Sequence, residues 1–303
     1  MSRTFVIGAR RSQLSLRQVD IVVTALLTAH PGCHTEFHEI ITQGDTSNAP
    51  LAQIGGLGVF TKAIEDALLS REIDIAVHSL KDLPPVLADG LVLGATPERA
   101  DVRDALITRG VRPLAQLRKG ARVGTGSARR AAQLKAIRPD LEISDIRGNV
   151  PTRMAKVESS EYDAIVLALA GLERLMLAEK AAHIFSVDEM VPAVGQGALG
   201  VEVRADDAET VELVHAIDHE STRIAVTAER ALLEHLGVGC RMPIGAFATL
   251  FGSDIHIRAI MGVDGGIRAS ERMGPVRNAL ALARQLGDDL QSPPMPDPAS
   301  SHR

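Results

Sequence analysis

The chain has 303 residues with a formal net charge of −5, and 45% of the residues are hydrophobic. This length supports two or three domains with apolar cores, which excludes a disordered protein, and the negative charge argues against a general nucleic-acid binder. No apolar run reaches the ~18 residues that cross a bilayer, the apolar start is too short for a signal peptide, and two cysteines cannot build a disulfide framework, so we expect a cytoplasmic protein.

The first hundred residues alternate between strand and helix patterns. Residues 4–10, 35–41 and 74–80 read as strands, and the apolar positions between the first two repeat at helical spacing. A second helix is expected over 61–70. This alternation predicts a mostly parallel sheet with both faces covered. The segment 43–60 is rich in Gly, Asn, Ser and Pro, and its length is typical of a lid or another functional loop.

The same alternation starts again near residue 101. Strands are expected at 121–126, 141–146 and 162–170. A helix over 127–137 has Ser127 as its N-cap, and a helix over 151–157 has Pro151 near its first position. Two similar α/β units in tandem predict two lobes with a cleft between them.

From about residue 220 the pattern changes to a helix, a run of period-two strands and a closing helix. These elements are expected at 220–236, 246–252, 254–263, 266–274 and 276–286. They predict a small α+β domain. Residues 291–303 form a tail rich in Pro and Ser that we expect to be disordered.

Arginine is concentrated where predicted strands give way to helices. These junction arginines are Arg10, Arg11, Arg129, Arg130, Arg147, Arg153 and Arg174. In a parallel sheet such junctions line the carboxyl edge, where helix N-termini add unpaired N–H groups and ligands bind. Because guanidinium groups match carboxylates in a bidentate geometry, the set predicts a cleft for a polyanionic small molecule. For any one of these arginines, an ordinary solvated surface position is an equally good interpretation.

Lys81 and Asp82 end the buried strand 74–80 and are followed by two prolines that forbid a helix. A carboxylate at that strand end faces the same cleft, where it could stabilise a developing cation or pass a proton. A plain Lys–Asp surface pair is the alternative interpretation.

Two further patterns imitate ligand sites. Residues 195–200 match G-x-G-x-x-G, but a strand follows them instead of a helix, so we reject a nicotinamide or flavin site. A metal cluster is imitated by His30, Cys33, His34 and His38. These four residues lie at a helix end and an edge turn with no second group of ligands, so no metal site is predicted.

Cys240 lies in a turn of small residues, after Gly237 and Gly239 and before Pro243. Small neighbours leave a thiol exposed, and exposure beside cations favours the reactive thiolate. A buried structural cysteine is an equally good interpretation of this residue taken alone.

Several segments, in order and at matching spacing, resemble the porphobilinogen deaminase family, whose members are also called hydroxymethylbilane synthases. They are AVHSLKDLP (76–84), GTGSARR (124–130), DIRGNVPTR (145–153), YDAIVLALAGLERL (162–175), VPAVGQGALGVE (191–202) and VTAERALLEHLGVGCRMPIG (226–245). The resemblance covers essentially the whole chain. It implies an α/β fold with two lobes like those of periplasmic binding proteins around a cleft, plus a small α+β C-terminal domain. The implied units are residues 1–97 with 192–216, 98–191 and 217–290, then the tail 291–303, with hinges at the crossings between lobes.

The resemblance also implies a transferase of tetrapyrrole, porphyrin and heme biosynthesis. Such enzymes join four porphobilinogen molecules head to tail with loss of ammonia, and hydrolysis then releases hydroxymethylbilane. The product grows on a covalent dipyrromethane cofactor, one per chain, held by a thioether to the cysteine that Cys240 matches.

By the same resemblance, Asp82 is the catalytic carboxylate, which stabilises the cationic pyrrole left when ammonia departs. Side chains that bind cofactor and substrate carboxylates are implied at Arg10, Ser12, Lys81, Ser127, Arg129, Arg130, Arg147, Arg153 and Arg174. The implied partner is the small molecule porphobilinogen, with no nucleic acid and no membrane, and we expect a monomer.

The sequence departs from the family pattern at Val238, Met242 and Leu57, where glycine, a β-branched residue and lysine are usual. Val238 bears on the turn that presents Cys240, and Leu57 removes one candidate contact to a carboxylate. Two alternatives to the enzyme stay open. One is a two-lobed module that clamps an anion without chemistry, and the other is an inactive relative that keeps the fold and the cofactor.

Overall fold

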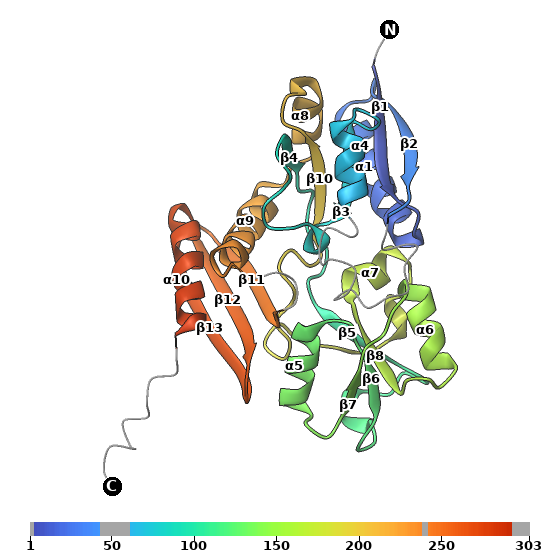
Figure 1. The fold of residues 1–303 in the computed structure, drawn as a ribbon, viewed down its shortest axis with the longest axis vertical. Helices are drawn as coiled ribbons and strands as arrows, with labels where there is room; N and C mark the ends of the chain where they lie inside the picture. Colours follow the sequence, from blue (N-terminus) through green and yellow to red (C-terminus); the bar gives the residue numbers. More distant parts are fainter. Residues whose placement is uncertain (1–2, 43–60, 238–241, 293–303) are drawn as a thin grey trace.

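The computed structural model describes residues 3–42, 61–237 and 242–292. In this part of the chain the strands form two five-stranded sheets and one three-stranded sheet. Each sheet packs against its own helices, and the resulting units are seen in Figure 1. We call the units built on the five-stranded sheets the first lobe and the second lobe, and the remaining unit the third domain.

The first lobe is built on a sheet with the strand order β2–β1–β3–β10–β4. Its strands are β1 (Thr4–Arg10), β2 (His34–Ile40), β3 (Ile75–Ser79), β4 (Leu91–Ala95) and β10 (Leu199–Arg204). Helices α1 (Gln13–Ala29) and α8 (Ala208–His215) pack on one face, and α4 (Lys62–Leu69) packs on the other. Strand β1 runs parallel to β2 and β3, whereas β10 runs antiparallel to β3 and β4.

The second lobe repeats this plan with the strand order β7–β6–β8–β5–β9. Its strands are β5 (Asp104–Thr108), β6 (Arg122–Gly124), β7 (Glu142–Ser144), β8 (Ala164–Ala168) and β9 (Ala181–Ile184). Helix α5 (Ala128–Ile137) covers one face, while α6 (Val150–Glu158) and α7 (Leu169–Arg174) cover the other. Strand β6 is parallel to β7 and β8, and β5 is antiparallel to β8 and β9.

The shared plan of the two sheets confirms the prediction of two α/β lobes. The prediction that the sheets are mostly parallel is wrong, because β10 is antiparallel to both of its neighbours in the first sheet and β5 is antiparallel to both of its neighbours in the second. The path of the chain explains the direction of β10. After β4 the chain crosses to the second lobe, and it returns to the first lobe along β10, which therefore enters the first sheet in the opposite direction (Figure 1).

Helix caps and burial explain where the elements of the two lobes begin. Ser12, Ser127 and Asn149 are the N-caps of α1, α5 and α6, and each side chain accepts a hydrogen bond from a backbone N–H of the first turn. The predicted cap at Ser127 is thereby confirmed. Every residue of β5 is buried, as expected for a strand covered on both faces.

The third domain is an antiparallel sheet with helices on one face, which confirms the predicted α+β unit. Its elements are α9 (Glu220–His235), β11 (Ile244–Phe251), β12 (Asp254–Val263), β13 (Gly266–Pro275) and α10 (Ala279–Gln291). The strands follow one another as a meander. Ala228 and Leu232 of α9 and Leu286 of α10 pack against Ile257 of β12 to form the core.

Two connecting segments carry the chain between the lobes, residues 96–103 outward and residues 191–198 on the return. They approach each other closely at Gly197, whose φ is +87° and where a Cβ atom would lie 2.5 Å from the carbonyl oxygen of Ala100. Only glycine satisfies both the positive φ and this close approach. The sequence G-x-G-x-x-G at 195–200 therefore has a structural role here, and the strand that the sequence predicts after it is present as β10.

A buried ion pair fixes the third domain to these connecting segments. The Arg99 guanidinium contacts the Glu229 carboxylate of α9 at 2.6 Å, and the Glu229 side chain is 0% exposed. Glu229 also accepts hydrogen bonds from the N–H of Gly195 at 2.7 Å and of Ala248 at 2.9 Å. One carboxylate thus joins the outward segment, the return segment and strand β11.

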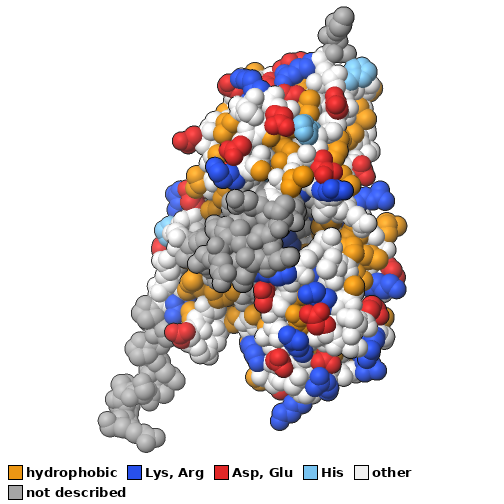
Figure 2. Space-filling model, turned by 45° about the vertical axis from the view of Figure 1, so that its right-hand side comes forward, with side chains coloured by type: hydrophobic (Ala, Val, Ile, Leu, Met, Phe, Trp, Pro, Cys, Tyr) orange, Lys and Arg blue, Asp and Glu red, His pale blue; other side chains and the backbone are white. Residues whose placement is uncertain are grey.

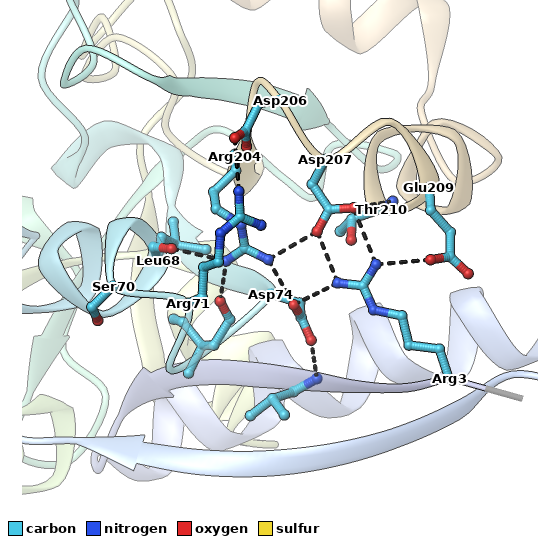
Figure 3. Close-up of polar contacts among 12 residues, drawn as sticks. Arg3, Leu68, Ser70, Arg71, Asp74, Arg204, Asp206, Asp207, Glu209 and Thr210 are labelled. Carbon is cyan, nitrogen blue, oxygen red and sulfur yellow. Dashed lines mark hydrogen bonds and ion pairs between the residues drawn. The ribbon is translucent and has the colours of Figure 1, made fainter. Parts of the chain in front are cut away.

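A second network of charges closes the first lobe at the amino ends of β1 and β3 (Figure 3). Arg3 Nη2 lies 2.7 Å from Asp74 and 2.8 Å from Asp207, and Arg204 contacts the same two carboxylates at 2.7 and 2.8 Å. Arg3 also reaches Glu209 at 2.9 Å. Residues that are far apart in the sequence are held together at this edge, which is opposite to the edge where β1 and β3 end.

Several elements differ from the sequence prediction. The expected strand 162–170 ends at Ala168, and Leu169 begins helix α7. Strands β4, β5 and β9 and helix α8 were not predicted. The segment 43–60 and the tail beyond Ser292 lie outside the described residues, so their predicted character is not tested. Among the helices that the structure describes, none is long and apolar enough to cross a membrane.

Candidate active site

Lys81 and Asp82 lie in a single 3-10 turn, Leu80–Asp82, that directly follows β3 at the carboxyl end of the strand. Both side chains are half-buried. The backbone after the turn is held from the third domain, because Arg230 of α9 donates hydrogen bonds to the carbonyl oxygens of Pro84 at 2.7 Å and Pro85 at 3.0 Å. The turn is therefore fixed at both ends.

The Lys81 ammonium group lies among charges from both lobes. Its Nζ atom is 3.5 Å from Oε1 of Gln196, which belongs to the return segment. Burial lowers the pKa of Lys81 to about 8, and the positive charges of Arg130 and Arg129 add to this effect. The negative charges of Asp82 and Asp104 oppose it. At neutral pH the side chain remains mostly protonated, although its proton is held less tightly than in water.

Arg129 and Arg130 open helix α5 of the second lobe, and both are buried. Arg130 donates from Nη2 to Asp104 Oδ1 at 2.6 Å and from Nη1 to the Val166 carbonyl at 2.9 Å. Arg129 Nη1 lies 2.8 Å from Asp104 Oδ2 and donates to the Val191 carbonyl at 2.6 Å. The arginine pair therefore surrounds a single carboxylate at the start of β5.

Arg147 lies in the loop before helix α6, and Arg153 lies in the first turn of that helix. Arg147 pairs with Asp145 at 3.1 Å, and Arg153 donates to the Gly148 carbonyl at 2.6 Å. Burial lowers the pKa of Arg153 to about 10, and the nearby positive charges of Arg130 and Arg147 contribute. Asp82 acts in the opposite direction, which places the carboxylate of the first lobe within electrostatic range of these arginines.

Arg174 lies away from this group of cations. It ends helix α7, donates to the Gly197 carbonyl at 2.7 Å, and has a buried Nε atom with no described hydrogen-bond partner. Burial lowers the pKa of Arg174 to about 10, opposed by the charge of Glu173. The side chain lines a groove of about 420 Å³ on the seam between α7 and α1, together with Arg17, Asp20, Ile21, Thr24 and Ala25.

The remaining predicted site residues fall into two groups. Arg10 is the last residue of β1 and Ser12 caps the helix that follows, so both lie at the carboxyl edge of the first sheet. Ser127 occupies the matching position before α5 and accepts a hydrogen bond from the Arg130 N–H at 3.4 Å. Cys240 lies outside the described residues, as do Val238 and Leu57. Met242 is described and is 41% exposed.

Two cations of the site differ from those on the surface in their partners. Figure 2 shows that the exposed Lys and Arg side chains of the second lobe are interspersed with Asp and Glu, as on an ordinary solvated surface. The exposed Arg11 fits this pattern, since its Nε lies 3.6 Å from Glu39. By contrast, the structure describes no ion pair between Arg153 or Arg174 and a carboxylate. Both side chains are half-buried, and a half-buried cation without an ion-pair partner is suited to an anionic ligand.

Sequence reasoning missed two residues of this site, Asp104 and Gln196. Asp104 is the charged residue that opens the apolar strand β5 directly after the outward segment, which is a usable signal. Gln196 lies inside the glycine pattern that was examined only as a dinucleotide motif. Its Nε2 donates to Asp104 Oδ1 at 2.8 Å and to the Val102 carbonyl at 2.7 Å.

Comparison with known proteins shows to which family the chain belongs. A family model described as the porphobilinogen deaminase dipyrromethane cofactor binding domain matches residues 5–212. The chain belongs to the porphobilinogen deaminase family. A second model, the porphobilinogen deaminase C-terminal domain, matches residues 223–292, so the two models together span the lobes and the third domain.

Individual porphobilinogen deaminases match over nearly the full length of the chain. The one from Roseiflexus sp. (strain RS-1) is 47% identical over 292 residues, which are 96% of each chain. The one from Syntrophotalea carbinolica is 47% identical over 287 residues, covering 94% of this chain and 91% of the relative. The one from Brevibacillus brevis is 44% identical over 286 residues, covering 94% and 93%.

Solved structures match more loosely. A putative methionine-binding lipoprotein from Bacillus subtilis has a TM-score of 0.45 at 13% identity, covering 72% of this chain and 92% of its own. A methionine-binding protein has a TM-score of 0.46 at 11% identity, covering 73% and 92%.

The chain is thus a transferase of the hydroxymethylbilane synthase type, which acts on porphobilinogen in tetrapyrrole, porphyrin and heme biosynthesis with a dipyrromethane cofactor. The residues present fit such a group. Dipyrromethane carries carboxylates, and the site offers the buried Nε atoms of Arg129 and Arg174, which have no described partner, and Arg153, which makes no ion pair with a described carboxylate. Each is a donor suited to a carboxylate oxygen.

Proposed function

We propose that Asp82 is the catalytic carboxylate of this porphobilinogen deaminase. The observation that carries the proposal is the convergence of the Lys81–Asp82 turn of the first lobe with arginines of the second lobe. Asp82 is half-buried at the end of β3, so it is fixed but reachable. When ammonia leaves porphobilinogen, the substrate pyrrole becomes cationic, and a fixed carboxylate beside it stabilises that charge.

Cations and hydroxyl groups at the carboxyl edges of the two sheets bind the acetate and propionate groups of the pyrroles. We assign this role to Arg10, Ser12, Lys81, Ser127, Arg129, Arg130, Arg147, Arg153 and Arg174. The acidity that burial imposes on Lys81 and Arg153 supports the assignment, because a bound carboxylate would restore the charge balance that these groups lack. Arg174 faces a separate groove, which suits a carboxylate of a ring more distant from Asp82.

Dipyrromethane, when bound, supplies the terminal pyrrole carbon to which the first porphobilinogen is joined. We propose that the chain holds one such group through a thioether to Cys240. The protein then orients it through the arginines of the second lobe, while Asp82 holds the N–H groups of the reacting pyrroles.

The unit boundaries are part of the same proposal. We divide the chain into residues 1–97 with 192–216, 98–191 and 217–290, with 291–303 as a tail. This division is supported by the strand orders, since β10 returns to the first sheet. We also propose a cytoplasmic monomer that binds porphobilinogen and neither nucleic acid nor membranes.

The mass of the denatured protein tests the anchor. A thioether survives denaturation, so the purified holoenzyme should weigh more than its sequence by two pyrrole units and should react with an acidic aldehyde reagent. Cys240→Ser should lose the extra mass, the colour and the activity, whereas the matched variant Cys33→Ser should keep all three. A bare polypeptide mass for protein made in cells that produce porphobilinogen would remove Cys240 from this role.

A further inference from the structure

Asp104 occupies a position in the site that neither the family resemblance nor the sequence pattern assigns. Its side chain is 0% exposed and lies at the first residue of β5, directly after the segment that leaves the first lobe. Burial by itself would raise the pKa of Asp104, but the charges and hydrogen bonds of Arg129 and Arg130 hold it well below its usual range. The arginine pair therefore favours the ionised form of Asp104.

The two oxygens of Asp104 hold three partners from different parts of the chain. Oδ1 accepts from Arg130 Nε at 3.0 Å, from Arg130 Nη2 at 2.6 Å and from Gln196 Nε2 at 2.8 Å. Oδ2 lies 2.8 Å from Arg129 Nη1. The carboxylate thus sets where both guanidinium groups of the pair point.

Gln196 continues these contacts to the first lobe. Its amide nitrogen donates to Asp104 and its amide oxygen lies 3.5 Å from Lys81 Nζ, next to the catalytic turn. Gln196 is 0% exposed and belongs to the return segment. A continuous set of polar contacts therefore runs from Lys81 through Gln196 and Asp104 to the arginine pair.

We propose that Asp104 is a positioning residue for the reaction, which through the arginine pair and Gln196 sets the carboxylate-binding groups of the second lobe relative to the Lys81–Asp82 turn of the first. The proposal rests on the assigned roles of Asp82 and the arginines. Two like charges packed side by side repel each other, and without a carboxylate between them they would separate. A displacement of about 1 Å in a binding group costs up to about 100-fold in rate.

The experiment is Asp104→Asn in the holoenzyme, which keeps the shape of the side chain and removes its charge. The cations remain, so binding of the anionic substrate should be largely retained while its placement is lost. We expect kcat to fall by about 10- to 100-fold with a smaller change in KM. The matched control is Asp101→Asn, because Asp101 pairs with Arg103 at 2.6 Å three residues earlier in the same segment and does not contact the arginine pair.

Two readouts separate positioning from a loss of folding. In the double variant Asp104→Asn with Arg130→Gln, kcat should lie within about threefold of that of Arg130→Gln alone, because both changes remove the same Asp104–Arg130 contact. The second readout is the pH dependence of Lys81 acetylation by acetic anhydride, followed by mass spectrometry. Because the Asp104 charge supports the protonated amine, its removal should shift this labelling curve to lower pH than in the parent, where the pKa is about 8.

A failure of this proposal can be told apart from a failure of the proposed function. A folded, cofactor-bearing Asp104→Asn protein with kcat within about twofold of the parent, an additive double variant, or an unmoved Lys81 labelling curve would each overturn the positioning role. The labelling curve needs no turnover, so it remains decisive even if Cys240 is not the anchor. If Asp104→Asn does not fold, Gln196→Met keeps the ionised carboxylate and cuts the link to Lys81. It should lower kcat while the arginine pair stays intact, and unchanged turnover would again refute the proposal.

Discussion

Asp82 and Asp104 are carboxylates among the same cations, but their surroundings give them different chemistry. Asp104 has no exposed surface and contacts both arginines of the pair, so it cannot meet a substrate. Asp82 is half-buried at a strand end, which suits the catalytic role that we propose for it. A carboxylate fixed by charged neighbours, such as Asp104, is suited to positioning other groups. A carboxylate for which the described residues provide no hydrogen-bond donor, such as Asp82, is suited to stabilising a reacting cation.

Asp82→Asn should lower turnover by orders of magnitude, because removing a group that stabilises a developing charge costs several kcal/mol. The fold should survive, since the side chain lies at the end of β3 and outside the apolar core. Steady-state kcat and a thermal unfolding curve together check this expectation. Asp66→Asn, which changes an exposed carboxylate on α4, is the control for the loss of one negative charge. Near-parental turnover by a folded Asp82→Asn protein would contradict the assignment.

The sequence shows some of these residues and hides others for a physical reason. Lys81, Asp82 and the junction arginines stand out because strand ends and helix starts are visible in the local pattern. Asp104 and Gln196 do not, because their partners are distant: Asp104 contacts Arg130 26 positions away, and Gln196 contacts Asp104 92 positions away. Only the fold brings these groups together, and the local sequence pattern does not indicate which distant residues will be in contact.

At the scale of elements, the Arg99–Glu229 ion pair decides how the third domain sits on the connecting segments. Glu229 accepts four hydrogen bonds in all: two from Arg99, at 2.6 and 3.0 Å, and two from backbone N–H groups. A carboxylate with no exposed surface can remain charged only with such a complete set of donors. The arrangement makes one side chain of α9 responsible for contacts with three separate segments.

Glu229→Gln should therefore lower the free energy of unfolding by about 3–5 kcal/mol, because it leaves the buried Arg99 guanidinium without its counter-ion. Denaturant unfolding at neutral pH is the measurement. Glu234→Gln changes an exposed carboxylate on the same helix and should alter stability by no more than about 0.5 kcal/mol. Equal stabilities of the two variants would mean that the pair contributes little to holding the third domain.

Hydrophobic periodicity alone cannot predict where some of these elements end or in which direction their strands run. Residues 164–170 are apolar without interruption, so the pattern cannot show that the strand stops at Ala168 and that a helix starts at Leu169. Strand β10 was predicted, but its direction was not, because a strand pattern is the same read either way. The antiparallel pairs of β10 depend on the return of the chain from the second lobe.

At the scale of the whole molecule, the polar contacts divide into those that serve the carboxyl edge of the first sheet and those that close its amino edge. The site lies where β1 and β3 end, while the Arg3 network lies where they begin (Figure 3). The network joins the start of the chain to Asp74 before β3 and to Asp207 after β10. The network stabilises the first lobe only while these carboxylates are ionised, so the stability of the first lobe should fall in acid.

The direction of this pH dependence follows from the pKa shifts of Asp207 and Asp74. The hydrogen bond from Arg3 is the largest cause that holds the pKa of Asp207 well below its usual range. For Asp74, burial acts to raise the pKa, but the Val6 N–H, Arg204 and Arg3 outweigh it and lower the pKa. A carboxyl group with a lowered native pKa stabilises the fold above its unfolded pKa of about 4, and this contribution is lost as the pH falls through the native value.

Arg3→Met tests this dependence, because it removes the guanidinium, which also lies over the Phe5 ring, while keeping an unbranched apolar side chain. The variant should lose about 1–2 kcal/mol of unfolding free energy at pH 6, since Arg3 is one-third exposed and contacts three carboxylates. As the carboxylates take up protons below about pH 4, the difference between variant and parent should shrink toward zero. Denaturant unfolding across this pH range is the measurement, with Arg17→Met as the control, because Arg17 makes only an exposed contact with Asp20 at 3.5 Å. A loss of equal size at pH 6 and in strong acid would show that Arg3 acts through packing and not through charge.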